Sequence, residues 1–254
     1  MTPQAKTPHA PVVLILGSGP NAVAARDWPR APFDLIVAIN NAHLLRPDWD
    51  VSIFPEDFPA DRRARPRRDQ RLVEAPDFVP AQNRFGGFVY AGGTMAFTAG
   101  YWVLDALRPK VMAFLGCDMV YPDKGKTHFY GTGTADPLRD DITLQSLEAK
   151  SARLALLAAE RGCACVNLSA DDSRLVFPRA TPMDAGGMVP VAPDQPALQA
   201  ALSTEAELGY HVPSGKYWQE ADRFDADKLA AIDALWLDAF AATAQADAPK
   251  RCVA

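Results

Sequence analysis

Short apolar runs alternate with segments of helical spacing along the first two thirds of this 254-residue chain, and this alternation constrains the fold most. Several runs are apolar throughout, which is typical of strands buried on both faces of a parallel sheet. The alternation predicts an α/β fold with an open, mainly parallel, Rossmann-like sheet and helices on both faces. The predicted strands are VVLIL (12–16), LIVAIN (35–40), VSIF (51–54), GFVYA (87–91), VMAFLG (111–116) and ACVNLS (164–169), and the predicted helices among them span 93–107 and 142–162.

The pattern changes after residue 177. Residues 178–198 are rich in Pro and Gly and predict a loop, whereas 194–208 and 225–244 have helical spacing. The predicted parts are an N-terminal tail (1–10), a Rossmann-like nucleotide-binding domain (11–177), and a loop with a short helical C-terminal appendage (178–254).

Composition excludes some classes of function. A net charge of −5 and a pI near 5.4 disfavour a nucleic-acid binder. No apolar run approaches the roughly 20 residues that a membrane-spanning helix needs. The start, MTPQAKTPHAP, lacks the apolar core of a secretory signal, so we expect a cytoplasmic chain with free thiols and no transmembrane span. The cysteines, Cys117, Cys163, Cys165 and Cys252, do not have zinc-site spacing, and no metal site is predicted.

The glycine turn after the first strand, Gly17-Ser18-Gly19, leads into a predicted helix at Pro20. Glycines let a backbone approach a ligand closely, and Pro suits the first helical position. The turn therefore predicts a phosphate or diphosphate at the carboxyl end of the first strand. A turn required only for tight strand-to-helix packing is the alternative. Asn40 follows the second strand where NAD-binding proteins need an acidic residue, which disfavours NAD.

Polar residues also follow other predicted strands. Asn40 and Asn41 end the second, Gly93 and Thr94 form a second glycine turn, and Asp118 comes directly after the strand at 111–116. Carboxyl ends of parallel strands share one sheet edge, so we expect Gly17, Gly19 and Asn40 to line one crevice. Asn40 as a turn former and Asp118 as a loop cap are the alternatives.

Two stretches resemble the bacterial sialyltransferases of the Campylobacter and Pasteurella type: LILGSGPNAVAARDWPRAPFDLIVAINNA, and YAGGTMAFTAGYWVLDALRPKVMAFLGCDMVY with the later HFYG. A family with pterin pyrophosphokinase activity, linked to flagellin glycosylation proteins, has a similar start and G-x-D strand. The chain departs from the sialyltransferases at Phe54, where they have Asn before Pro, and at Thr132, where they have the catalytic histidine.

The resemblance implies a binding site for a CMP-linked sugar donor. It implies Gly17, Ser18, Gly19 and Asn21 at the donor phosphates and Asn40 near phosphate or ribose. It also implies Gly93 and Thr94 near the nucleoside.

The segment CDMVYPDKGKTHFYGTGT holds the predicted chemistry. His128 has an ordinary pKa suited to a general base, and Asp118 is the next candidate. Tyr121, Lys126 and Tyr130 are predicted to bind the departing phosphate. The alternatives are a loop histidine without a special task and tyrosines that only anchor the loop.

These features predict a glycosyltransferase-like enzyme that uses a nucleotide-activated sugar, with a CMP-sugar favoured, as substrate and no resident cofactor. The alternatives are a pyrophosphokinase-type transferase and a non-catalytic nucleotide or phosphate binder. The stretch DRRARPRRDQR contains six arginines between Arg62 and Arg71. Its interspersed acids predict a solvated loop face, and an acidic acceptor or membrane phosphates are its alternative ligands.

Overall fold

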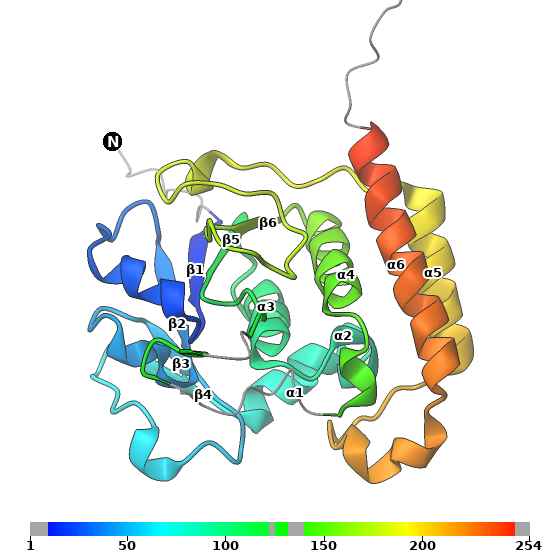
Figure 1. Cartoon of the computed structure of the whole chain (residues 1–254), viewed down its shortest axis with the longest axis horizontal. Coiled ribbons are helices and arrows are strands. Elements are labelled where there is room, and N and C mark those ends of the chain that lie inside the picture. The colour runs from blue at the N-terminus through cyan, green and yellow to red at the C-terminus, as the bar shows by residue number, and fades with distance from the viewer. Residues whose placement is uncertain (1–9, 122–124, 132–139, 247–254) are drawn as a thin grey trace, which may run out of the picture.

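The computed structural model describes residues 10–121, 125–131 and 140–246, and it is built on one six-stranded parallel sheet. The predicted open α/β, Rossmann-like fold is therefore confirmed (Figure 1). The strands are β1 (Val12–Leu16), β2 (Leu35–Ile39), β3 (Val51–Ile53), β4 (Arg71–Val73), β5 (Val111–Leu115) and β6 (Ala164–Asn167), in the spatial order β4-β3-β2-β1-β5-β6.

The order of the strands places a topological switch between β1 and β5. The chain runs outward from β1 to β4 and then returns to β5 on the other side of β1. Leu16 pairs with Ala38 of β2 and with Leu115 of β5, so three strands end at nearly the same level. Open α/β sheets bind ligands outside the carboxyl ends of the strands at such a switch.

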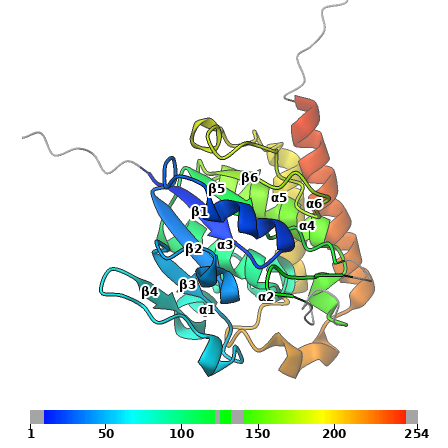
Figure 2. The same ribbon diagram turned by 60° about the vertical axis from the view of Figure 1, so that its left-hand side comes forward.

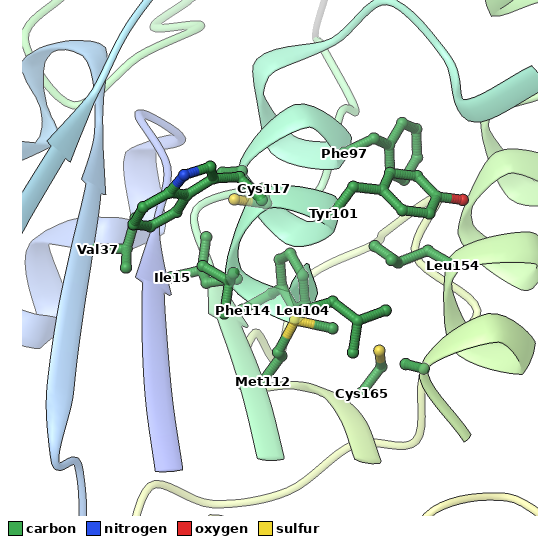
Figure 3. Close-up of a cluster of buried hydrophobic side chains, with 14 of the residues drawn as sticks. Ile15, Val37, Phe97, Tyr101, Leu104, Met112, Phe114, Cys117, Leu154 and Cys165 are labelled. Carbon is green, nitrogen blue, oxygen red and sulfur yellow. The ribbon is translucent and has the colours of Figure 1, made fainter. Parts of the chain in front are cut away.

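Three α-helices cover one face of the sheet: α1 (Ala75–Asn83), α3 (Met95–Ala106) and α4 (Leu147–Ala159). Alternate residues of the strands point into this layer, so Ile15, Val37 and Phe114 pack with Phe97 and other α3 side chains (Figure 3). Thr94 is the N-cap of α3, because its hydroxyl accepts a hydrogen bond from the Phe97 amide in the first turn. The predicted helices at 93–107 and 142–162 are therefore present, the second preceded by the 3₁₀ helix η5 (Ile142–Leu144).

The other face carries 3₁₀ helices and loops. Ala22 and Ala25 of η1 (Pro20–Arg26) pack with Leu14 and Leu16, and Figure 2 shows this dark-blue segment on the opposite side of the sheet from α3. The short helices η2 (Asn40–Leu44) and η6 (Ala185–Gly187) also contribute to this layer. Part of the Pro- and Gly-rich segment predicted as a loop thus covers the sheet through Ala185.

The C-terminal helices form an outer layer against α4. These helices, α5 (Gln195–Leu208) and α6 (Ala226–Ala246), lie together on the side of α4 away from the sheet (Figure 1). Their apolar side chains share a core with α4 and with α2 (Phe88–Ala91). The C-terminal helices are consequently packed onto the α/β layers through a common core, and the helices predicted at 194–208 and 225–244 are present as α5 and α6.

Three local predictions were wrong or missing. GFVYA forms the single helical turn α2, because Gly87 and Gly92 on either side have φ angles near +90° and interrupt an extended chain. Strand β4 and helix α1 were not predicted, since β4 has three residues and begins with the exposed Arg71.

No helix in the described ranges combines the length and apolarity needed to cross a bilayer.

Candidate functional site

A pocket of about 660 Å³ lies at the switch point, outside the carboxyl ends of β1, β2 and β5. Gly17, Gly19 and Asn40 all line it, which confirms the prediction of one crevice. The other sequence-predicted residues that line it are Ser18, Asn21, Asn41, Thr94, Asp118, Tyr121, Lys126, His128 and Tyr130. Gly93 instead lines a neighbouring pocket, where its amide donates to Thr143 Oγ1 at 2.9 Å, so the structure does not place it with the other predicted nucleoside contacts.

The glycine turn packs tightly against the turn after β5. The Gly17 amide donates to the Leu115 carbonyl and the Gly19 amide to the Gly116 carbonyl, both at 2.8 Å. A Cβ atom on Gly17 would lie 2.2 Å from the Gly116 oxygen, and one on Gly19 would lie 2.9 Å from it. The close packing of the two turns is therefore sufficient to explain why positions 17 and 19 are glycines. Tertiary contact uses both of these amides, so neither of them is available to the phosphate that the turn predicts.

Asn21 joins the ends of β1, β5 and β6 through its side-chain amide nitrogen. That nitrogen lies 2.7 Å from Asp118 Oδ2, 2.7 Å from Ser169 Oγ and 3.0 Å from Asp171 Oδ2. Asn167 Nδ2 lies 3.3 Å from Asp118 Oδ1, so amide groups from two segments hold this carboxylate. Asn167, Ser169 and Asp171 were not predicted as site residues. Asn167 and Ser169 fall inside the strand predicted at 164–169, whereas β6 ends at Asn167, and only Asp171 follows the predicted strand.

Three polar oxygens of the pocket are buried without a hydrogen-bond partner among the described residues: Ser18 Oγ, Asn21 Oδ1 and Asn40 Oδ1. A buried polar group without a partner costs about 1–3 kcal/mol, so three in one pocket are expected where a ligand completes the hydrogen bonding. Asn40 and Met119, which also lines the pocket, have left-handed backbones with φ angles of 52° and 55°. Strained residues of this kind cluster at ligand sites.

A loop lies over the glycine turn and presents His128 to the pocket. The Phe129 amide donates to the Ser18 carbonyl at 3.0 Å, and His128 and Gly131 exchange backbone hydrogen bonds. The His128 ring stacks on Tyr130 with centroids 5.0 Å apart, and its Nδ1 lies 2.9 Å from Thr127 Oγ1. These contacts hold the imidazole in one orientation at the pocket.

Metal and thiol chemistry gain no support from the described residues. Among them, no three His, Cys, Asp or Glu side chains are grouped as ligands of a metal ion. Cys117 lines the pocket, but burial, together with the neighbouring Asp118, raises the pKa of its thiol. The thiol therefore stays protonated and is a poor nucleophile. Cys163 and Cys165 are buried and free, as predicted, whereas Cys252 lies outside the described residues.

A second pocket, of about 690 Å³, adjoins the first and shares Met95 with it. Phe88 stacks on Tyr217 with centroids 6.2 Å apart, and Trp218 meets Tyr217 edge-on at 5.5 Å. The Trp218 side chain is 62% exposed, which is unusual for such a large apolar group. This second pocket therefore has an aromatic wall.

The arginine-rich segment is mostly a solvated loop, as predicted. Arg65, Arg67 and Arg68 are exposed, whereas Arg63 bends back to Glu74, 3.7 Å away, and over the Phe54 ring. Arg62 differs from them because it lines the first pocket.

In comparisons with protein-family models, with curated proteins and with solved structures, nothing matches this chain significantly.

Proposed function

We propose that this protein is a glycosyltransferase-like enzyme that uses a nucleotide-activated sugar as donor, with a CMP-sugar favoured. The first pocket supports nucleotide binding because it lies at the switch point and contains three buried oxygens that lack partners. Asn21 Oδ1 and Asn40 Oδ1 accept hydrogen bonds, so hydroxyl or N–H groups of a nucleoside suit them.

The observation that favours transfer over simple binding is the second pocket. Transfer needs two substrates in contact, and the two pockets meet at Met95. The aromatic wall formed by Phe88, Tyr217 and Trp218 suits an acceptor with an apolar face.

In the proposed transfer reaction, different residues of the first pocket act on the attacking hydroxyl and on the departing phosphate. An acceptor hydroxyl oxygen bonds to the anomeric carbon of the donor while the bond from that carbon to the phosphate oxygen breaks. His128 takes the proton of the attacking hydroxyl, and Asp118 is the next candidate for this task. Tyr121 and Tyr130 donate hydrogen bonds to the departing phosphate.

A pyrophosphokinase is the alternative enzyme. It would hold magnesium through one or two carboxylates and the phosphates of its substrate, and Asp118 and Asp171 line the first pocket together. A non-catalytic binder has the same first pocket, and an activity measurement separates it from an enzyme.

The test begins with a thermal-shift screen of CMP, UDP, GDP, ATP and NAD, followed by transfer assays with sugar conjugates of whichever nucleotide binds. A nucleotide at a hundred times its Kd stabilises the fold by about 2.7 kcal/mol. We then expect His128→Ala to lower turnover by about 10²- to 10⁴-fold while the donor Kd stays within about twofold. His211→Ala, which changes an exposed histidine outside both pockets, is the matched control. Full turnover by the His128 variant at saturating substrates would contradict its role, and absence of any nucleotide binding would reject the proposed function.

A further inference from the structure

The first pocket has an acidic end and a cationic end. Asp118 and Asp171 line it from the segments that follow β5 and β6. Arg62 lines it from the segment after β3, which lies on the other side of β1 in the sheet. The order of the strands thus places Arg62 across the pocket from these two carboxylates, whereas Lys126, which also lines the pocket, follows β5 as Asp118 does.

The acidic end accepts hydrogen bonds and repels anions. The Asn21 amide nitrogen already faces Asp118 and Asp171, which leaves its buried Oδ1 as the group without a partner. The two carboxylates fix this orientation of the Asn21 amide. They can only accept hydrogen bonds, and the amide nitrogen carries hydrogen atoms to donate whereas the amide oxygen does not. Ligand hydroxyl or N–H groups are therefore suited to this end, and a phosphate is not.

The two glycine amides of the turn are not available to a phosphate, which leaves the Ser18 hydroxyl as a side-chain donor there. The amides of Gly17 and Gly19 donate to carbonyl groups of the β5 turn, as described above. The helix that follows the turn is the seven-residue 3₁₀ helix η1, which lacks the aligned peptide dipoles of a long α-helix. The phosphate of a bound nucleotide thus needs another partner.

Arg62 is well placed to be that partner. Within the described part of the chain its guanidinium forms no ion pair, although it lines the pocket beside Phe58 and Pro59. The neighbouring Arg63 turns the other way and donates to the carbonyls of Phe58 and Glu56 at 3.1 and 3.0 Å. These bonds hold the loop closed and leave Arg62 on its pocket side. A guanidinium binds phosphate oxygens through paired, charge-assisted hydrogen bonds.

We propose that Arg62 binds the phosphate of the nucleotide, so that the ligand lies with its nucleoside donor groups at Asn21 and its phosphate within reach of Arg62. This inference rests on the proposed function, since it assigns an orientation to the same nucleotide. It also separates Arg62 from the other arginines of its loop, which face solvent or pack on the protein.

Arg62→Ala and Arg65→Ala form a matched pair of variants. Both remove one positive charge from the same exposed loop, but Arg65 lines neither pocket. Isothermal titration calorimetry at 150 mM salt, chosen to screen distant charges, compares CMP, UMP, AMP and GMP with their nucleosides. For each nucleotide that binds, we expect Arg62→Ala to weaken binding about tenfold and to change nucleoside binding less than twofold. Arg65→Ala is expected to change both less than twofold.

Three results would overturn this assignment: unchanged nucleotide affinity in Arg62→Ala, equal losses in both variants, or an equal loss for nucleotide and nucleoside. If the unaltered protein binds no nucleotide, the proposed function fails, and titration with inorganic pyrophosphate decides the role of Arg62. Weaker pyrophosphate binding in Arg62→Ala than in Arg65→Ala then supports an anion site. Equal binding, or no binding by the unaltered protein, overturns it.

Discussion

Replacement of Glu205 by alanine is expected to cause a large loss of stability in the C-terminal layer. Glu205 on α5 is 5% exposed and accepts two hydrogen bonds from Arg153 of α4, each 2.8 Å long. It also accepts one from the indole Nε1 of Trp236 on α6 at 2.7 Å. One carboxylate thus connects α4, α5 and α6.

The magnitude follows from the charge that the substitution leaves behind. Burial alone would lower the pKa of Arg153, but Glu205 and Tyr101 raise it above its ordinary value, so the guanidinium is charged. In Glu205→Ala this cation stays buried, with Tyr101 Oη and the Phe85 carbonyl as its remaining partners. Removal of one partner from a buried ion pair costs about 3–5 kcal/mol. That is a large fraction of the roughly 5–15 kcal/mol that stabilises a typical protein.

Equilibrium unfolding in urea, followed by far-UV circular dichroism and by tryptophan fluorescence, measures this loss. The control is Glu220→Ala, which removes an exposed ion pair with Arg223 and is expected to cost less than about 1 kcal/mol. Glu205→Gln, which retains an acceptor for Arg153, is expected to lie between the two and serves if the alanine variant does not fold. A cost below about 1 kcal/mol for Glu205→Ala would refute the view that the buried ion pair fastens the C-terminal helices to the domain.

Two further predictions concern the glycine turn and the response to acid. Gly17→Ala is expected to lower the free energy of unfolding by about 1–3 kcal/mol, because its Cβ would overlap a backbone oxygen, whereas Gly187→Ala meets open space and is expected to be nearly neutral in the same urea titration. The hydrogen bonds from Arg84 hold the pKa of Asp105 below its ordinary value of 3.8, so its ion pair stabilises the fold above about pH 4 and is lost as the pH falls through the lowered pKa. Asp105→Asn is therefore expected to destabilise the protein at pH 6 and to differ less from the unaltered protein at pH 3, and an equal difference at both pH values would contradict this assignment.

The fold class and the position of the first pocket could be predicted from the sequence because both depend on local patterns. Strands β1 and β5 are apolar at every position, and such runs are stable only when both faces are covered. Asn40 follows a predicted strand, and residues at the carboxyl ends of parallel strands share one edge whatever side chains surround them. Local pattern failed at β4, which unlike the equally short β3 begins with an exposed arginine, and at α2, whose apolar run FVYA has the composition of a strand but lies between two glycines with positive φ.

The chemistry of the site depended on contacts between distant segments, which only the tertiary structure decided. The family resemblance assigned Asn21 to the donor phosphates, yet its amide nitrogen faces Asp118 and Asp171, 97 and 150 residues away in the chain. Gly93 and Thr94 were both predicted near the nucleoside, but Thr94 lines the first pocket and Gly93 lines the second. A side chain's neighbours are set by how strands and helices pack, and no period or motif within one segment records that packing. The sequence therefore determined which residues reach the edge of the sheet, and the tertiary structure determined which atom of each residue is left for a ligand.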